Sequence, residues 1–237
     1  MIVYGRNPVR EAIRGPRPVH RAWATKNAAR EPWLANAGVP VAVTGAEEIE
    51  QRCASPDHQG ICAEVGAFHY AFAEALLTAA RPLIVVLDQI QDPQNLGAIC
   101  RSAECAGATG VVIGERRSAE VTPAVCKASA GAVEHLPVAR VRNIADFLGE
   151  AKAAGVWCYG ADGGAPLAYD EVDFAGPVAL VLGSEGRGLR PRVAAACDAL
   201  VAIPLRGRIE SLSVGAAAAV LMYAAAAVSV AESDAPA

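Results

Sequence analysis

Several signatures of familiar protein classes are missing from this sequence of 237 residues. It contains neither G-x-x-x-x-G-K-[ST] nor G-x-G-x-x-G, which argues against a P-loop or dinucleotide-binding α/β protein. None of its seven cysteines stands in a C-x-x-C pair, and no histidine joins them at the spacing of metal ligands. We therefore expect no metal site and a reduced, cytoplasmic protein.

Charged and aromatic residues are scarce as well, at 19% and 5% of the sequence. With 53% hydrophobic residues the chain is too apolar to be disordered, and its abundant alanine predicts helices with small side chains. The first residues, MIVYGRNPVR, lack the long apolar stretch of a signal peptide. The uncharged run 214–231 is long enough for a membrane span, but it is alanine-rich and lacks flanking aromatic anchors. We expect a buried or interface helix there and no membrane association.

The charge is distributed unevenly, although the net value is only −4. Residues 1–30 hold one acidic residue, Glu11, and seven basic ones, so their net charge is +6 and the rest of the chain carries −10. The basic residues are Arg6, Arg10, Arg14, Arg17, Arg21, Lys26 and Arg30. This pattern fits a basic face for a polyanion and, equally, the solvated surface of a small helical unit.

The order of predicted elements indicates an α/β protein with two units. Residues 1–66 alternate short strands and helices, including helices beginning at Asn7-Pro8, with Asn7 as N-cap, and over 28–37. Residues 67–81 connect the units, and a helix is one conformation open to them. Residues 82–231 predict a larger α/β unit with a parallel sheet, and residues 232–237 a frayed tail.

In the second unit, three polar, glycine-bearing loops follow apolar strands, at 88–95, 183–188 and 204–213. Open α/β sheets bind ligands at the carboxyl ends of their strands, so these loops predict a site. Asn95 is placed to cap a helix over 96–106, and Ser211 or Ser213 is placed to cap the last helix.

The same loops carry three motifs in a fixed order. LDQIQDPQNLGAICRSAECAGATGVVI contains N-x-G-x-x-x-R through Asn95, Gly97 and Arg101, and LVLGSEGRGL contains G-x-E-x-x-G. IPLRGRIESLSVGAAAAV resembles a motif I-P-x-x-G…S-L-N-V. Together they resemble the SpoU/TrmH branch of the SPOUT methyltransferases. YGRNPVREAI and HQGICAEV resemble the RNA-binding unit of its ribosomal guanosine 2′-O-methyltransferases, so the resemblance covers nearly the whole chain.

The resemblance implies a small L30e-like N-terminal α/β domain that binds RNA, followed by a SPOUT α/β domain with a parallel sheet and a C-terminal trefoil knot. It also implies a homodimer and S-adenosylmethionine bound in the knot. The expected reaction is 2′-O-methylation of a ribose, first of all a guanosine in large-subunit (23S) ribosomal RNA. Transfer RNA is the alternative substrate, and a catalytically weakened RNA-binding assembly factor is the alternative function.

The resemblance also assigns roles to residues. The expected catalytic residues are Arg101, Asn95, Glu185 and Ser211. The expected cofactor-binding residues are Gly183, Ile203, Leu212, Leu182 and Ser213. The expected RNA-binding residues are Arg6, Arg10, Arg206 and Arg208. Because arginine is always protonated, Arg101 suits a phosphate contact or the stabilisation of a developing alkoxide better than proton abstraction.

Each of these roles has a structural alternative. Arg101 could be an ordinary surface arginine of a helix, and Ser211 a helix cap. Glu185 could pair with an arginine or order its own loop through backbone N–H groups. Two positions depart from the family pattern, because Ser213 stands where asparagine is usual and Gly215 where serine is usual. Serine offers one O–H donor and shorter reach than an asparagine amide.

Overall fold

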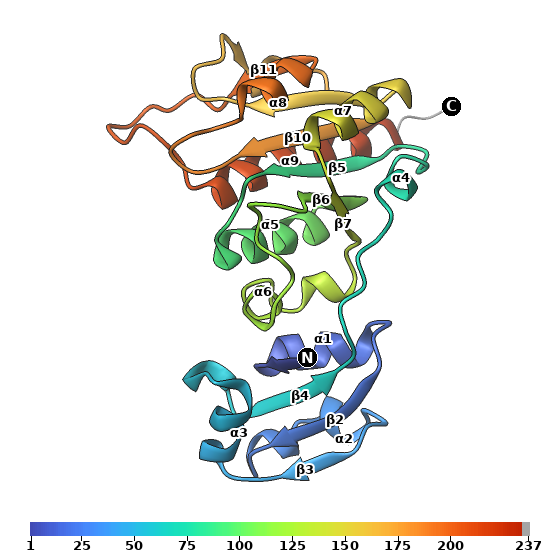
Figure 1. Cartoon of the computed structure of the whole chain (residues 1–237), viewed down its shortest axis with the longest axis vertical. Coiled ribbons are helices and arrows are strands. Elements are labelled where there is room, and N and C mark those ends of the chain that lie inside the picture. Colours follow the sequence, from blue (N-terminus) through green and yellow to red (C-terminus); the bar gives the residue numbers. More distant parts are fainter. Residues whose placement is uncertain (234–237) are drawn as a thin grey trace.

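The computed structural model describes the backbone of residues 1–233 and the side chains of residues 1–227. It has two α/β units stacked along the long axis of the molecule (Figure 1). The smaller unit contains a four-stranded sheet in the order β1-β4-β2-β3. Its elements are β1 (Ile2–Tyr4), α1 (Arg6–Arg14), β2 (Val19–Ala24), β3 (Val41–Val43), α3 (Ala46–Cys53) and β4 (Ile61–Val65). Strand β4 runs antiparallel to both neighbours, while β2 and β3 are parallel.

Two helix predictions in this unit are wrong in detail. Helix α1 begins at Arg6 with Gly5 as its N-cap, so Asn7 lies inside the helix. The helix expected over 28–37 is divided into a 3₁₀ turn, Ala28–Arg30, and a short α2, Pro32–Ala35. Pro32 explains the division, because proline forces the preceding residue out of the helical region and cannot donate a hydrogen bond to the turn before it.

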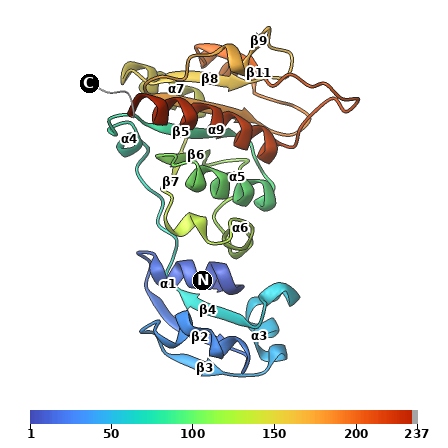
Figure 2. The ribbon, with the colours of Figure 1, turned by 180° about the vertical axis from the view of Figure 1, so that it is seen from behind.

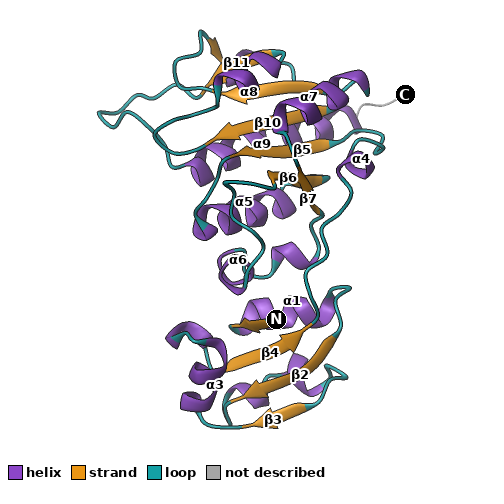
Figure 3. Ribbon diagram, viewed as in Figure 1, coloured by secondary structure: helices purple, strands orange, loops and turns teal. Residues whose placement is uncertain are grey.

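The segment between the units is mostly extended (Figure 3). Helix α4 covers only Ala73–Leu76, so the possible helix over 67–81 is confined to one turn. Before it, Ala71 forms a parallel bridge with Ala139 of β7 (Val138–Val141). The connecting segment is therefore fastened to the edge of the larger sheet.

The larger unit is built on a seven-stranded parallel sheet in the order β7-β6-β5-β10-β8-β11-β9. Besides β7, its strands are β5 (Leu83–Asp88), β6 (Gly110–Gly114), β8 (Trp157–Ala161), β9 (Leu167–Ala168), β10 (Val178–Gly183) and β11 (Ala199–Ala202). Strand β10 lies beside β5, with Gly183 opposite Asp88 at the carboxyl end of both strands. The parallel α/β architecture expected from the sequence is thus confirmed, whereas the knot stays a prediction.

Helices cover both faces of this sheet (Figures 1 and 2). On one face lie α5 (Pro93–Cys105) and α9 (Val214–Ser233), against Val85, Leu87, Leu180 and Leu182, while α6 (Pro123–Ala128) packs on α5. On the other lie α7 (Ile144–Ala153) and α8 (Pro191–Ala196), against Ile84, Val86, Ala179 and Val181. Alternate residues of β5 and β10 thus enter opposite layers, as the pleat of a strand requires.

Helix α9 matches the buried helix expected for the uncharged run. Ala218, Leu221, Met222 and Ala225 are buried against the sheet, while Tyr223 is exposed. Within the part of the chain that the structure describes, none of the helices combines the length and apolarity needed to span a membrane. The tail expected at 232–237 lies largely outside the described residues, and helix α9 is described through Ser233.

The two units contact each other through α1 and the segment after α6. Arg17 Nε donates to Glu134 at 2.8 Å, and both side chains are almost completely buried. Nearby, His135 Nε2 lies 3.1 Å from Glu11, and Lys127 Nζ donates to the carbonyl of Asp57 at 2.7 Å. Part of the basic charge of residues 1–30 therefore holds the two units together instead of facing solvent.

Candidate functional site

The glycine-rich turn after β10 is folded back so tightly that Gly183 has no room for a side chain. A Cβ on Gly183 would lie 2.1 Å from the carbonyl carbon of Gly188, far inside van der Waals contact. The turn closes through a hydrogen bond of 2.9 Å from Gly188 N to Ser184 O. Gly186 and Gly188 adopt φ values of 77° and 64°, which favour glycine. The glycines of this motif are thus required by the geometry of the turn.

Glu185, at the centre of this turn, holds the start of the last helix. Its Oε1 accepts a hydrogen bond of 3.2 Å from the backbone N–H of Val214, the first residue of α9. Ser213 Oγ accepts one of 3.3 Å from Ala216 N. The two oxygens together satisfy backbone N–H groups that a helix leaves free at its N-terminus, where negative charge is also favoured. Of the two serines expected to cap α9, it is Ser213 that does so.

A second contact fastens the same turn to the neighbouring strand. Asp88, at the end of β5, is 1% exposed, and its carboxylate accepts hydrogen bonds from Arg190 Nε at 2.7 Å and Arg190 N at 2.9 Å. Charge-assisted hydrogen bonds of this length are among the stronger polar contacts in proteins. Neither residue is among the predicted site residues, although the sequence places an aspartate at the end of an apolar strand and an arginine just after the glycine-rich turn.

A cavity of about 240 Å³ lies between this turn and the loop 203–214. Its lining includes most of the expected cofactor residues and two of the expected catalytic ones, namely Leu182, Gly183, Ile203, Leu212, Glu185 and Ser211. Leu182 and Ile203 give the cavity apolar walls, while Asp162 and Glu210 add carboxylates at its rim. Ser213 is not part of the lining. An apolar slot edged by a few polar groups is a usual arrangement for a small ligand.

A second hollow of about 450 Å³ adjoins the first, because Ser184 and Glu185 line both. Its other lining residues include Gln89, Asp92, Asn95 and Arg187. The structure therefore brings Asn95 of the first motif and Glu185 of the second motif to one place. This convergence of the carboxyl ends of β5 and β10 is what the three loops predicted (Figure 3).

The prediction that Asn95 caps its helix is wrong. Helix α5 begins three residues earlier than expected, at Pro93, and its N-cap is Asp92, whose Oδ1 accepts from Gln94 N at 3.0 Å. Proline is favoured at the first position of a helix, where its missing N–H costs nothing. Asn95 consequently lies in the first turn of α5, and its side chain does not cap the helix.

Gly97 and Arg101 complete the first motif but play different parts. A Cβ on Gly97 would lie 2.4 Å from that of Ala128, so this glycine permits the close packing of α5 on α6. Arg101 is exposed on α5, lines neither hollow, and has no ion-pair partner among the described residues. The structure does not bring Arg101 to the cavity of its own chain.

The expected RNA-binding arginines fall into two groups. Arg6 and Arg10 lie on α1 and form ion pairs with Glu31 at 3.0 Å and Glu11 at 2.8 Å. Arg206 and Arg208 lie on the exposed loop after β11 and form no ion pair within the described part of the chain.

Helix α5 carries two cysteines, which differ in burial. Cys100 is fully buried and packs in the core, whereas Cys105 is exposed. Burial raises the pKa of the Cys100 thiol to about 12.

Comparison with known proteins finds related sequences over nearly the whole chain. The family model described as the SpoU rRNA methylase family matches residues 82–223, and the model described as RNA 2′-O ribose methyltransferase substrate binding matches residues 2–71. A protein of Bacillus subtilis named as a TrmH family tRNA/rRNA methyltransferase is 37% identical over 232 residues, which cover 93% of each chain. A Staphylococcus haemolyticus protein of the same family name is 33% identical over 94% of each chain.

Solved structures show the same fold. The crystal structure of an rRNA methyltransferase from Sinorhizobium meliloti with bound S-adenosylmethionine has a TM-score of 0.79 at 25% identity, and the match covers 94% of this chain and 85% of that one. The methyltransferase AviRb from Streptomyces viridochromogenes, also with S-adenosylmethionine, has a TM-score of 0.80 at 24% identity and coverage of 97% and 90%. Two family models, full-length relatives and a shared fold lead to one conclusion: the chain belongs to the SpoU/TrmH family of RNA methyltransferases, which use S-adenosylmethionine.

Proposed function

We propose that this chain methylates the 2′-hydroxyl of a ribose in RNA, with a guanosine of 23S ribosomal RNA as the first substrate to test. The observation that carries the proposal is the pair of adjoining hollows that share Ser184 and Glu185. One hollow has apolar walls suited to a cofactor, and the other is open and polar and contains Asn95. A methyl donor in the first would face a ribose in the second.

The first hollow suits S-adenosylmethionine. Backbone groups of Gly183, Ile203 and Leu212 are available to the adenine, and Leu182 supplies an apolar wall. The Gly188 backbone packs against Gly183 where a Cβ would stand, so the turn stays folded on the end of β10 and forms one wall of the slot. The bound cofactor supplies an activated methyl group on a positively charged sulfur. The chain's own task is to hold the slot open and to position the RNA, and Glu185 contributes by fixing α9 against the turn.

The second hollow receives the ribose. Asn95 orients the ribose or its phosphate with an amide that both donates and accepts hydrogen bonds, and Ser211 contacts the nucleotide from the loop after β11. Holding the hydroxyl in line with the reacting methyl group contributes much of the rate gain. Arg101 stabilises the negative charge that develops on the ribose oxygen or orients the adjacent phosphate. Because Arg101 lies outside the hollows of its own chain, we propose that a homodimer completes the site with Arg101 of the partner subunit.

The first domain and the loop after β11 bind the RNA. We propose an L30e-like RNA-binding domain over residues 1–66, a linker over 67–81 and a SPOUT domain over 82–231, with its knot at the C-terminus and a tail over 232–237. Arg6 and Arg10 contact RNA from the first domain, and Arg206 and Arg208 from the exposed loop beside the cofactor slot. The match of residues 2–71 to a substrate-binding model supports this division. We place the protein in the cytoplasm, where its substrate is made.

One experiment tests the proposal against its alternatives. The protein is incubated with labelled S-adenosylmethionine and either undermethylated ribosomal RNA or transfer RNA, and the modified ribose is mapped. Label at a 2′-O position of 23S ribosomal RNA is the expected result. Label only in transfer RNA would change the substrate. No label in either RNA, with cofactor binding intact, would point to an RNA-binding assembly factor whose activity is weakened by Ser213 and Gly215.

A further inference from the structure

Phe72 is an unusually exposed aromatic residue, with 82% of its surface accessible. The chain has only four phenylalanines, and the other three, Phe68, Phe147 and Phe174, are buried or half-buried. The backbone beside Phe72 is fixed, because Ala71 bridges to β7 and its N–H donates to Val138 O at 2.8 Å. Among the described residues, no other aromatic ring stacks on Phe72. A large apolar ring is thus held in solvent by an ordered segment, against the usual tendency of phenylalanine to be buried.

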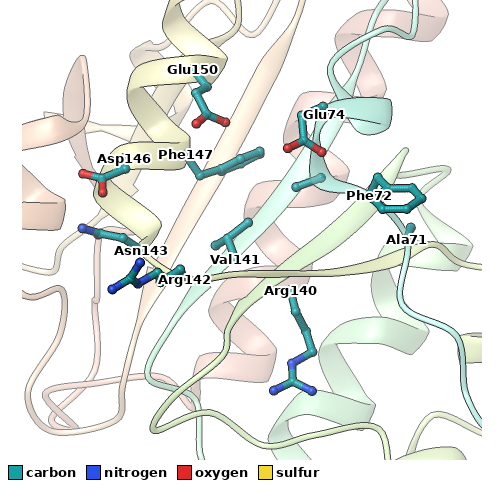
Figure 4. A pocket seen from close by; sticks show the side chains of 11 residues that line it. Ala71, Phe72, Glu74, Arg140, Val141, Arg142, Asn143, Asp146, Phe147 and Glu150 are labelled. Atoms are coloured by element: carbon teal, nitrogen blue, oxygen red, sulfur yellow. The ribbon is translucent and has the colours of Figure 1, made fainter.

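A hollow of about 340 Å³ lies beside this ring (Figure 4). Buried Phe147 contributes to its lining, and the charged side chains divide by sign. In Figure 4, the carboxylates of Glu74, Asp146 and Glu150 lie above Val141, and the guanidinium groups of Arg140 and Arg142 lie below it. The hollow therefore offers an aromatic face, carboxylate acceptors and guanidinium donors within one lining.

The charged residues of this hollow differ in whether they already form ion pairs within the chain. Arg140 pairs with Glu120 at 3.3 Å and lies over the Tyr70 ring at 5.0 Å. Arg142 has no ion-pair partner in the described part of the chain, and the same is true of Glu74 and Glu150. One cation and two carboxylates are thus available to a ligand that brings both a negative group and N–H donors.

The hollow adjoins a second one of about 460 Å³ at the start of α7. Arg142, Asn143 and Asp146 also line the next hollow, which contains Arg190 and Arg192. Arg190 follows the glycine-rich turn, and Arg187 of that turn lines the hollow that holds Asn95. Two adjoining hollows thus reach from Phe72 to Arg190, which is three residues from Arg187 in the chain, and the hollow with Asn95 shares no lining residue with them.

We propose that Phe72 stacks on an unpaired base of the substrate RNA, several nucleotides from the methylated ribose, while Arg142 binds a phosphate beside that base. This inference rests on the proposed function in that the polyanion is taken to be the RNA substrate. Single-stranded RNA is recognised by aromatic stacking and by hydrogen bonds to the edges of splayed bases, and arginine is well suited to its phosphates. Glu74 and Glu150 accept hydrogen bonds from base N–H groups, which favours guanine with its adjacent imino and amino donors.

The test measures binding of a fluorescein-labelled single-stranded RNA of mixed sequence, together with methyl transfer to undermethylated 23S ribosomal RNA. Phe72→Ala is expected to weaken RNA binding roughly tenfold, the effect of losing one base–aromatic stack, and to raise KM for RNA with kcat and cofactor affinity unchanged. Phe72→Trp keeps an aromatic face and is expected to restore binding. The matched control is Trp157→Ala, since Trp157 is also exposed but lies at the amino end of β8, away from the hollows.

A second variant tests the phosphate contact. Arg142→Ala is expected to weaken binding and to make its dependence on salt shallower by about one counterion, because a lost phosphate contact releases one fewer ion. Ultraviolet cross-linking of the wild-type complex, followed by mass spectrometry, is expected to place a nucleotide on the peptide that contains Phe72.

The outcomes separate this inference from the proposed function. If wild-type protein methylates RNA and Phe72→Ala binds RNA as wild type does, the stacking proposal is overturned and the function stands. If wild-type protein binds RNA and cofactor without methyl transfer, the function fails, and the binding data on Phe72 still decide the stacking proposal. If Phe72→Ala changes only the mass of the assembly in sedimentation, the ring contacts a second protein chain and the proposal is wrong.

Discussion

Glu185 joins two parts of the site that are 29 residues apart in the chain, because its Oε1 accepts a hydrogen bond of 3.2 Å from Val214 N. The glycine-rich turn and the start of α9 both line the proposed cofactor cavity. The contact of Glu185 therefore ties together two parts of that lining.

Removing the Glu185 carboxylate is expected to loosen the cavity without unfolding the protein. Glu185→Ala should lower the free energy of unfolding by about 1 kcal/mol, the usual value of a helix N-terminal contact, and weaken S-adenosylmethionine binding about tenfold. Glu185→Gln keeps an oxygen acceptor and should lose less of both. Isothermal titration calorimetry and thermal unfolding measure the two effects. An alanine variant that binds the cofactor like wild type would remove Glu185 from the role of organiser.

The glycine at the end of β10 gives a sharper test. Gly183→Ala places a methyl group 2.1 Å from the Gly188 carbonyl carbon, so the turn must open and cofactor binding should be lost. Gly207→Ala is the matched control, because Gly207 lies in the facing loop, has no atom within 4 Å of the added Cβ and has no positive φ. Calorimetry that found equal cofactor affinity in both variants would show that the turn tolerates opening.

Burial of the Cys100 thiol makes the free energy of unfolding depend on pH at alkaline values. Its thiol pKa is raised from an ordinary value of 9.0 to about 12, so the folded state keeps a proton that the unfolded state loses between these values. The contribution of this thiol to the free energy of unfolding is therefore present in full below pH 9 and falls as the pH rises above it, by roughly 1 kcal/mol at pH 10. Urea unfolding at pH 8 and pH 10 should show a smaller decrease for Cys100→Ala than for wild type. Cys105→Ala is the control, since Cys105 is exposed on the same helix.

The contact between the two units predicts a large effect at a position far from the site. Arg17→Ala leaves the fully buried Glu134 carboxylate without its partner, which should cost about 3–5 kcal/mol of unfolding free energy. The double variant Arg17→Met, Glu134→Leu removes both charges and should recover most of that loss. Arg52→Ala breaks an exposed pair with Glu48 on α3 and a contact with the Trp23 ring, and should cost only about 1 kcal/mol. If urea midpoints of Arg17→Ala and Arg52→Ala coincide, the buried pair is not what holds the units together.

The parts of the fold that the sequence predicted are those determined by nearby residues. The apolar runs that became β5 and β10 read as buried strands, and the glycines at 183–188 indicated a tight turn. The loop residues at the ends of these strands converged as expected, because parallel strands bring their carboxyl ends to one edge. Two predictions from nearby residues were wrong. The helix expected to begin after Asn95 begins at Pro93 with Asp92 as its cap, and Pro32 divides the helix expected over 28–37.

The contacts that could not be predicted join residues far apart in the sequence. Arg17 and Glu134 are separated by 117 residues, and Arg190 and Asp88 by 102. Nothing in the local pattern distinguishes Arg17, which is buried, from Arg14, which is exposed three residues earlier. The same holds for Phe72, whose exposure depends on how the connecting segment pairs with β7. Partners of this kind follow from the packing of elements that are distant in the sequence, which no short stretch of sequence contains.

The position of Arg101 leads to the last prediction, which concerns how the site is completed. Arg101 is exposed on α5 and lines neither hollow of its own chain, whereas Glu185 lines both. Arg101→Ala should abolish methyl transfer with S-adenosylmethionine binding retained, and Glu104→Ala, an exposed neighbour on the same helix, should remain active. If a homodimer completes each site with Arg101 of the partner subunit, mixing Arg101→Ala with Gly183→Ala protein should regain activity. In a mixed dimer, one site then combines an intact cofactor cavity with an intact arginine. Mass spectrometry checks that mixed dimers have formed. If they have formed and methyl transfer does not return, Arg101 acts in the site of its own chain.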